Sequence, residues 1–571
     1  MQEIKTRKWK EPPEITVEIS NNLIKYPQEI RQALFTRGIH DIEKATEFFD
    51  ATKPLFDPYL LFDMDKAVNR FLEALHQNEK IAIYGDFDAD GICATALLTE
   101  ALSSLGAKLI PYIPDRLEEG YGLNIKAIKY LASIDAKLII TVDCGIRSIE
   151  EVALAQSLGM DVIVSDHHYP RETIPPAYAI LCPKREGEPY PNKDISGVGL
   201  AYKLASAILL QEGFSVSTIE RYLDLVALGT VADVVPLNGE NRVLVRKGIE
   251  VIHRGERMGL FALTLIAGLD IKNINAHHIG FMIGPRLNAA GRISEAEISL
   301  HLLLEKDKQK AIELAKELDR LNSLRQEKTK AAINSAEEII AIQGQKDILS
   351  IVKEDYEEGI VGLVAAKLKE KFYRPTIVGV IRENTIRASC RSIPEFHITQ
   401  ALDSCTNLLL QHGGHALAAG FTINHDKYDL LIEKLNEIAM EKLEGKEIAP
   451  ELRGDAIVSL GQFQPESSIE YLNLFEPTGS CNQRPLFFSK NVSIKNKWKI
   501  GRDESHLKLS VIQDGITYDA IAFGKGEMFD SLAKSVDIAY HYDVNHFNGE
   551  ERLQLHILDI KNVGDQNEFT E

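Results

Sequence analysis

The sequence has few cysteines and no long apolar run, and both shortages exclude classes of protein. Six cysteines are scattered among 571 residues, without a Cys-x-x-Cys pair or a paired Cys and His spacing. A disulfide framework and a structural zinc site are therefore not expected, and reduced thiols fit best. No apolar run approaches a membrane span, and the N-terminus lacks an apolar signal core. These features predict a cytoplasmic protein without a membrane partner.

Positive charge is also scarce. The chain has 65 Lys and Arg against 84 Asp and Glu, which gives a net charge of −19. A protein that coats nucleic acid is usually basic, so the composition argues against an extended DNA-binding surface. Part of the negative charge can belong to a metal site, and acidic helices such as residues 433–447 can face away from a local basic groove.

The length indicates several domains, since 571 residues are too many for one hydrophobic core. The predicted fold class is α/β, with a doubly wound parallel sheet, a long connecting helix, a second smaller α/β domain and a C-terminal β-barrel. In chain order we expect an N-terminal extension (residues 1–50), the parallel-sheet domain (51–304) and the connecting helix (305–345). The second α/β domain (346–446), the barrel (450–562) and a disordered tail (563–571) are expected to follow.

The connecting segment 306–342 is predicted to be one long amphipathic helix, because Ile312, Ala315, Leu318 and Leu321 recur at three-residue steps among Lys and Glu. Such a helix can be a rigid strut between two domains, or it can pack on one domain only with its other face solvated. The second α/β domain is expected to contain strands near Ile348 and Thr376 and a helix over 359–371.

Three short runs of branched apolar residues each end in an acidic motif. The motifs are Gly85-Asp-Phe-Asp-Ala-Asp-Gly91, Asp143-Cys-Gly145 and Asp166-His-His168. The runs are rich in Ile and Val, and helical segments follow the first two, so they are predicted to be buried parallel strands. The carboxyl ends of such strands meet at one edge of the sheet, where open parallel sheets bind ligands.

The five aspartates of these motifs are expected to converge in one crevice: Asp86, Asp88, Asp90, Asp143 and Asp166. Several would have to bind protons unless cations were present. Carboxylates with one or two imidazoles suit Mg²⁺ or Mn²⁺. Two ions are favoured, because a two-metal centre binds both the attacking and the leaving oxygens of a phosphoryl displacement, which predicts hydrolysis of a phosphate ester. Any one motif could be an ordinary turn, but three together favour the metal site.

These motifs resemble the first three motifs of the DHH phosphoesterases, a family named after the residues of the third. Segments Gly229–Leu237, Gly284–Arg292 and Gly413–Gly420 are similar to later motifs of the same family. The ordered set covers residues 81 to 421. It is most similar to the branch of exonucleases that are specific for single-stranded DNA.

The resemblance implies the following metal ligands: Asp86, Asp88, Asp90, Asp143, His167 and Asp233. It implies that Asp143 bridges the two ions, that His168 faces the scissile phosphate, and that Asp166 orients its neighbours. Catalytic roles are thus expected for Asp143, His167, His168 and Asp166. The chain departs from the pyrophosphatase members at Tyr84, where they carry a ligating His, and we expect Asp86 to replace it.

Further residues are candidates for binding DNA. Ser389 and Arg391 resemble the pocket of the family for a terminal 5′-phosphate, and Arg116 looks similar in role, although it could equally form a surface salt bridge. A guanidinium binds phosphate oxygens bidentately.

The segment Gly284–Gly291 is interpreted as a loop whose small residues let the strand approach. In or beside it lie Arg286, Asn288 and Arg292. The segment Gly413-Gly414-His415 could bind phosphate closely, or its glycines could simply end a helix. His277 and His278 have no acidic neighbours in sequence and are interpreted as structural.

Short alternating runs between 450 and 562 predict a small β-barrel, and the resemblance implies an OB-fold that binds single strands. Trp498, Phe523 and Tyr540 could stack on bases, although such aromatic residues are more often in the core.

The predicted function is a two-metal exonuclease that hydrolyses single-stranded DNA from the 5′ end to 5′-mononucleotides, in DNA repair and recombination. The direction follows from the resemblance alone. Candidate partners are a single-strand-binding protein and a helicase, and a monomer is expected. Two other functions stay open: hydrolysis of short oligonucleotides, cyclic dinucleotides or pyrophosphate, and a non-catalytic scaffold for replication proteins.

Overall fold

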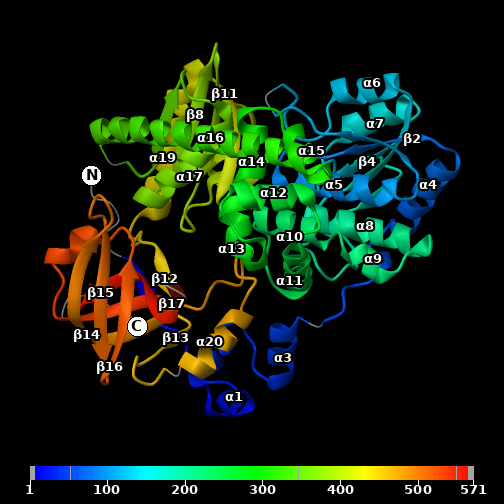
Figure 1. Ribbon diagram of the computed structural model, residues 1–571. Helices are drawn as coiled ribbons and strands as arrows, with labels where there is room; N and C mark the ends of the chain where they lie inside the picture. The colour runs from blue at the N-terminus through cyan, green and yellow to red at the C-terminus, as the bar shows by residue number, and fades with distance from the viewer. Residues whose placement is uncertain are drawn as a thin grey trace. The chain divides into compact units, whose positions relative to one another are not determined.

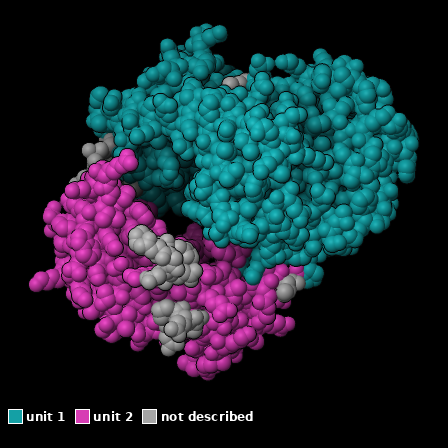
Figure 2. Space-filling view, in the orientation of Figure 1, with its two compact units in different colours: residues 1–5, 54–448 teal, residues 6–53, 449–571 magenta. Residues whose placement is uncertain are grey.

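The computed structural model describes residues 7–51, 53–116, 118–344, 346–463, 465–547 and 550–563. The chain divides into two compact units, coloured separately in Figure 2. Unit 1 consists of residues 1–5 and 54–448, and unit 2 of residues 6–53 and 449–571. Of the tail predicted to be disordered, all but Val563 lies outside the described residues. No helix in the described part of the chain combines the length and the apolar character needed to cross a membrane.

Unit 1 begins with a five-stranded parallel sheet in the order β3-β2-β4-β5-β6 (Figure 1). Its strands are β2 (Lys80–Tyr84), β3 (Lys108–Tyr112), β4 (Ala136–Val142), β5 (Asp161–Ser165) and β6 (Ala179–Leu181). Since β3 lies on one side of β2 and β4 on the other, the strand order reverses between β2 and β4. Ligands bind at such a switch point, at the carboxyl ends of the strands. The predicted doubly wound sheet is confirmed.

Both faces of this sheet are buried, because alternate side chains of each strand enter different cores. One face packs on α4 (Met64–His76), α5 (Ala89–Ser103) and α8 (Gly197–Gln211). The other face packs on α6 (Ile125–Ser133) and α7 (Ile149–Ser157). In the sequence these strands are therefore continuous apolar runs, and this is why they could be predicted from the sequence.

Residues 182–304 contain helices and no strand among the described residues, so the alternation of strand and helix predicted up to residue 304 is wrong beyond Leu181. After α8 come α9 (Val216–Glu220), α10 (Leu223–Ala232), α11 (Gly239–Arg254), α12 (Met258–Ile266), α13 (Ala276–His278), α14 (Gly284–Ile293) and α15 (Glu297–Leu304). The reason is burial on all sides: α8 and most of α10 are buried around their whole circumference. A helix of this kind has no polar face and cannot be told from a buried strand by periodicity.

The predicted long helix is confirmed as α16 (Lys308–Gln343), which Asp307 caps by accepting a hydrogen bond from Lys310 N. Ala315 and Leu318 lie in the core of the first domain. Ala336 and Ile340 lie in a core with β7 (Leu349–Lys353) and α17 (Glu358–Phe372). The helix therefore packs on both domains, as the strut interpretation requires.

The second sheet has the order β10-β11-β9-β8-β7, and only its β7–β8 pair is parallel. Its remaining elements are β8 (Thr376–Arg382), β9 (Thr385–Arg391), α18 (Ile398–Asp403), β10 (Leu409–His415), β11 (Ala418–Asn424) and α19 (Tyr428–Leu443). The strands predicted near Ile348 and Thr376 and the helix over 359–371 are confirmed. Gly413 and Gly414 lie within β10, opposite Gly420 and Ala419, so their alternative interpretation as a helix stop is wrong.

Unit 2 contains a closed five-stranded barrel, in which β14 pairs with both β15 and β17. Its strands are β14 (Phe487–Ile500), β15 (His506–Gln513), β16 (Ile516–Ala522), β17 (Ser535–Phe547) and β18 (Glu550–Asn562). Tyr540 is fully buried and its hydroxyl lies 3.0 Å from Ser489 Oγ, so its candidate role as a stacking platform is wrong. Trp498 and Phe523 are 46% and 56% exposed.

The N-terminal helices belong to the same unit as the barrel. They are α1 (Val17–Asn22), α2 (Gln28–Phe35) and α3 (Ile42–Asp50). Phe49 packs on Phe475 with 5.3 Å between ring centroids, and Arg37 Nη1 donates to Asp455 Oδ1 over 2.5 Å. Thus segments from the two ends of the chain share one core.

A buried ion pair in unit 1 yields a stability prediction. Lys203 Nζ donates to Glu240 Oε1 over 2.6 Å, and both side chains are 2% exposed. Lys203→Met should lower the free energy of unfolding by about 3 kcal/mol, because Glu240 would keep a buried charge without its cation. Urea denaturation followed by circular dichroism would measure this. Arg320→Met is the matched control: it breaks the exposed pair with Glu317, and it should lower the free energy of unfolding much less than Lys203→Met does. Equal losses in the two variants would contradict the argument.

Candidate active site

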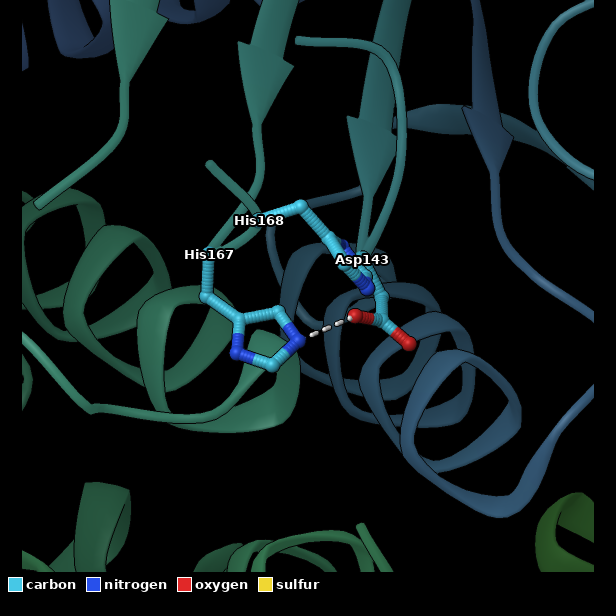
Figure 3. A group of neighbouring side chains, drawn as sticks. All are labelled: Asp143, His167 and His168. Carbon is cyan, nitrogen blue, oxygen red and sulfur yellow. Dashed lines mark ion pairs between the residues drawn. The ribbon is translucent and has the colours of Figure 1, made fainter. Parts of the chain in front are cut away.

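The carboxyl ends of β2, β4 and β5 place acidic and histidine side chains at one edge of the parallel sheet. Three sets offer ligand atoms within 4.8 Å of one another: Asp86, Asp88 and Asp143; Asp90, His167 and Asp233; and Asp143, His167 and His168. The third set is drawn in Figure 3. The structure thus brings together all six residues that were expected to bind metal. Asp143 and His167 each belong to two of the sets, and of these two only the carboxylate of Asp143 has two oxygens with which it could bridge two ions.

Asp143 has a left-handed backbone, with φ at 63°. Such a conformation is strained for residues other than glycine and tends to persist at functional sites. Gly197, the first residue of α8, lies against this side chain: a Cβ there would be 2.6 Å from the Cβ of Asp143. Gly197 was not among the residues predicted from the sequence, because the only feature that points to it is a Gly-x-Gly pair at the start of a helix, and such pairs are common.

Several ligand atoms at this edge are buried and make no hydrogen bond to any described residue. They are Asp86 Oδ1, Asp143 Oδ1 and both ring nitrogens of His167. His167 Nε2 lies 3.0 Å from Asp143 Oδ1 (Figure 3) without hydrogen-bond geometry. Buried polar atoms are normally paired, so their number here needs an explanation. Carboxylate oxygens with an imidazole are a donor set that fits Mg²⁺ or Mn²⁺.

The charges of the site are unfavourable on their own. Burial, and then the neighbouring carboxylates, raise the pKa of Asp86, Asp143 and Asp233 well above the usual range. The same causes raise the pKa of Asp90 to about 7. Burial lowers the pKa of His167 to about 3, which keeps its imidazole neutral and able to ligate. A divalent cation would remove the repulsion and favour the ionised carboxylates.

Asp88 and Asp90 also hold the local backbone. Asp88 caps α5 by accepting hydrogen bonds from Asp90 N and Gly91 N. Asp90 accepts from Gly197 N over 2.7 Å and from Val198 N over 2.8 Å, at the start of α8. The two interpretations of this motif, a structural turn and a metal site, are therefore compatible. The carboxylates that hold the backbone at the helix starts are also close to the other expected ligands.

Asp166 lies beneath His168. Its Oδ1 is 2.8 Å from His168 Nδ1, and its Oδ2 accepts from Ile146 N. Burial opposes ionisation of Asp166, but the hydrogen bond and charge of His168 hold the pKa of this carboxyl below its usual value. The bond leaves His168 Nε2 available, as a residue facing a substrate needs. Tyr121, which the sequence analysis did not select, has its hydroxyl 3.1 Å from His168 Nδ1 and donates to the carbonyl of Asp143.

Tyr84 is fully buried and faces a loop. Its hydroxyl donates to Gly122 O over 3.0 Å and accepts from Asn124 Nδ2. Asp86 lies within the set that includes Asp88 and Asp143. This position is compatible with the expected replacement of the missing His by Asp86.

A cleft of about 810 Å³ lies in unit 1 beside His168. Residues of both α/β domains line it, including Arg116, Ser389, Gly413 and Gly414. A Cβ at Gly362 of α17 would lie 3.2 Å from both Arg391 Nη2 and Ser389 Oγ. Any larger residue at this position would crowd the two side chains that resemble the 5′-phosphate pocket, so glycine favours the close approach of α17.

Guanidinium groups gather beside this cleft. Burial lowers the pKa of Arg116, Arg391 and Arg292, the last to about 9, and repulsion from Arg116 adds to the effect at the other two. Arg116 lies 4.8 Å above the ring of Phe87. It has no ion pair within the described ranges, so its alternative interpretation as a surface salt bridge is not supported. Clustered, poorly neutralised cations of this kind favour an anionic ligand.

The segment Gly284–Gly291 forms part of helix α14, so its interpretation as a loop is wrong. Its small residues allow close packing: a Cβ at Gly291 would lie 2.7 Å from the carbonyl oxygen of Phe87. Asn288 Oδ1 accepts from Ala89 N over 2.8 Å, and thereby supports the acidic motif after β2. Arg286 is paired with Asp319 at 2.9 Å.

The remaining histidines, His415, His277 and His278, have different surroundings. His415 lies at the end of β10, and its ring centroid is 6.5 Å from that of Tyr169. His278 completes a capping box with Asn275, while His277 packs on Phe281. The structural interpretation of this pair agrees with these contacts.

The repulsion among the carboxylates predicts how stability depends on pH. The folded protein holds the protons of these groups more tightly than the unfolded chain does, so in EDTA the melting temperature should fall as pH rises from about 5 to about 8. Saturating Mn²⁺ should raise it again. Asp143→Asn should raise the melting temperature in EDTA at about pH 8 and reduce the rise caused by Mn²⁺, because it removes a repelled charge and a ligand.

Asp135→Asn is the matched control. Asp135 has the same φ of 63°, but it is 73% exposed and lies before the amino end of β4. It should alter neither the pH dependence nor the effect of Mn²⁺. A full Mn²⁺ response in Asp143→Asn would contradict the proposed centre.

Three family models match the chain. They are the DHH family N-terminal domain at residues 80–230, the DHHA1 domain at 344–441 and the RecJ OB domain at 455–559. The resemblance to the DHH phosphoesterases and the expected OB-fold are confirmed.

Curated relatives match nearly the whole chain. The single-stranded-DNA-specific exonuclease RecJ of Bacillus subtilis (strain 168) is 37% identical over 93% of this chain and 67% of its own length. That of Escherichia coli (strain K12) is 35% identical over 94% and 96%. A crystal structure of RecJ from Thermus thermophilus in complex with Mn²⁺ matches with a TM-score of 0.84 and 28% identity, over 97% of this chain and 79% of that one. A Mg²⁺ complex of the same protein matches with a TM-score of 0.77 and 26% identity, over 97% and 78%. The chain therefore belongs to the RecJ family of single-stranded-DNA-specific exonucleases.

Proposed function

We propose that the protein hydrolyses single-stranded DNA from the 5′ end, with two Mn²⁺ or Mg²⁺ ions, and releases 5′-mononucleotides. The observation that carries the proposal is the convergence of six acidic and histidine side chains at the switch point of the parallel sheet, with buried ligand atoms that make no hydrogen bond to a described residue. The relatives named as exonucleases, and their complexes with Mn²⁺ and Mg²⁺, support the same activity.

The metal ions would be held by the six expected ligands: Asp86, Asp88, Asp90, Asp143, His167 and Asp233. When bound, two such ions stabilise the negative charge that develops on the attacking and leaving oxygens of a phosphodiester and help to activate water. Asp166 fixes the ring of His168 through Nδ1, so that Nε2 can donate a hydrogen bond to the scissile phosphate. The hydroxyl of Tyr121 lies 3.1 Å from the same Nδ1 and also supports the ring.

A site for the chain end supports the 5′ direction that the resemblance implies. Arg116 and Ser389 line the cleft that also contains His168, and the guanidinium of Arg391 lies with Ser389 against Gly362. Together they would offer guanidinium and hydroxyl donors to a terminal phosphate. A terminal phosphate monoester carries more negative charge than an internal linkage, so a cluster of arginines favours it. Arg292 adds a further buried cation, while the pairing of Arg286 with Asp319 leaves it less charge to offer DNA.

Residues of both units are proposed to make further contacts with the single-stranded DNA. Gly413 has open space where a Cβ would be, so β10 can approach a phosphate closely, and His415 lies at the same end of the strand. Trp498 and Phe523 are exposed on the OB barrel and can stack on bases. A barrel of this kind favours long strands over dinucleotides.

We infer that the protein acts as a monomer in DNA repair and recombination, with a single-strand-binding protein and a helicase as candidate partners.

The direction can be tested with strands labelled at either end. In Mn²⁺, a 5′-labelled strand should release its label as a mononucleotide at once, and a 3′-labelled strand should give a ladder of shortening products. Asp143→Asn should lower kcat by at least about 10³-fold, because the transition-state charge would lose its electrostatic stabilisation. The Asp135→Asn variant should keep full activity. A ladder from the 5′ label instead would contradict the proposed direction.

The chain-end site predicts a preference for a 5′-phosphate over a 5′-hydroxyl. Arg391→Lys should reduce this preference by about 10-fold or more, since an ammonium cannot reproduce a bidentate guanidinium contact. The kcat/KM values for the two ends would measure it. Arg382→Lys, which alters an exposed arginine elsewhere on the same sheet, should leave the ratio unchanged. If Arg391→Lys left the ratio of the two kcat/KM values unchanged, Arg391 would not belong to the 5′-phosphate site.

A further inference from the structure

Lys184 is a cation at the metal edge of the sheet that neither the motifs nor the 5′-phosphate site includes. It follows β6, the last strand of the parallel sheet, by three residues. Ser165 of β5 is paired with Leu181 of β6, and Asp166 N donates to Leu181 O. The segments after β5 and β6 therefore leave the sheet side by side, and Lys184 lies at the same edge as His167 and His168.

The side chain of Lys184 is held and largely removed from water. Its ammonium lies 4.7 Å from the ring centroid of Tyr169, and the side chain is 14% exposed. Its carboxylate partner, Asp194, is 3.8 Å away and 53% exposed. A hydrated, distant partner neutralises a cation only weakly. Lys184 therefore keeps charge and donor capacity for another anion.

The contacts of Tyr169 indicate where this ammonium lies. Tyr169 follows the expected ligand His167 by two residues, and its ring centroid lies 6.5 Å from that of His415. His167 Nε2 in turn lies 3.6 Å from Asp233 Oδ2. Arg116, in contrast, lies 4.8 Å from the ring centroid of Phe87, within the motif after β2. The two cations thus lie beside different ligand segments, Arg116 beside the one after β2 and Lys184 beside the one after β5.

We propose that Lys184 binds the phosphodiester that follows the scissile one on its 3′ side. The inference rests on the proposed function, which puts the terminal 5′-phosphate at Arg391 and Arg116. A strand that starts there and crosses the metal ligands reaches the His167 and Asp233 side, where Lys184, Tyr169 and His415 lie together. An ammonium with three donors can bind a non-bridging phosphate oxygen without a fixed orientation.

The test uses the full-length protein and two 5′-phosphorylated single strands. One strand is unmodified, and the other carries a neutral methylphosphonate between its second and third nucleotides. Dissociation constants are measured in EDTA by fluorescence anisotropy, so that the result does not depend on turnover, and kcat/KM is then measured in Mn²⁺. The variants are Lys184→Met and the control Lys137→Met, which removes the same charge from the amino end of β4.

In the wild type, and in Lys137→Met, the methylphosphonate should weaken binding by about 10-fold, the lower range for a hydrogen bond between charged groups. Lys184→Met should bind the unmodified strand about 10-fold more weakly and should not discriminate between the two strands. In saturating Mn²⁺ the variant should still unfold cooperatively by circular dichroism, which would show that the lower affinity is not a loss of the fold. If Lys184→Met discriminated like the wild type, the contact would be refuted. If the wild type degraded neither strand in Mn²⁺, the proposed function would fail instead.

Discussion

The repulsion between buried carboxylates at the edge of the parallel sheet is the constraint on which the rest of the site depends. Asp86, Asp143 and Asp233 are held too close together, and too far from water, to be ionised without a compensating charge. A protein that needed only a stable fold would replace these groups with apolar ones. Their retention is understandable if divalent cations are part of the working molecule, because the ions convert repulsion into ligation.

Several features of the backbone serve this arrangement. Asp143 takes a left-handed conformation, and Gly197 leaves room for its side chain. Asn288 on α14 holds the motif after β2, and Asp166 holds His168. The ligands thus come from different strands, but their positions are set by residues that do not themselves belong to the metal sets. A change at one of these supports would displace a ligand without removing it.

The distribution of charge resolves the conflict between a net charge of −19 and a nucleic-acid substrate. Cations are concentrated where a strand would lie: Arg116, Arg292 and Arg391 gather beside the cleft, and Lys184 lies near His167 and Asp233. Because these groups are partly desolvated and weakly paired, few of them suffice for local attraction.

Much of the fold and the site could be predicted from local patterns. Continuous Ile and Val runs identified β2, β4 and β5, and three-residue apolar spacing identified α16. The acidic motifs identified the metal-binding edge, since parallel strands end together. Local patterns failed where burial erased periodicity, as in α8 and α10, and where a glycine-rich helix, α14, had the composition of a loop.

By itself the sequence determined which strands form, which residue types follow them, and hence that a metal-dependent hydrolase was expected, because these depend on neighbours along the chain. Only the tertiary structure decided that Gly197 lies against Asp143, that Asn288 supports the backbone of the motif after β2, that Tyr540 is core, and that Lys184 lies over Tyr169 at the same edge as the ligands. These facts depend on contacts between segments far apart in the chain, and no short sequence pattern encodes which side chain will face which neighbour.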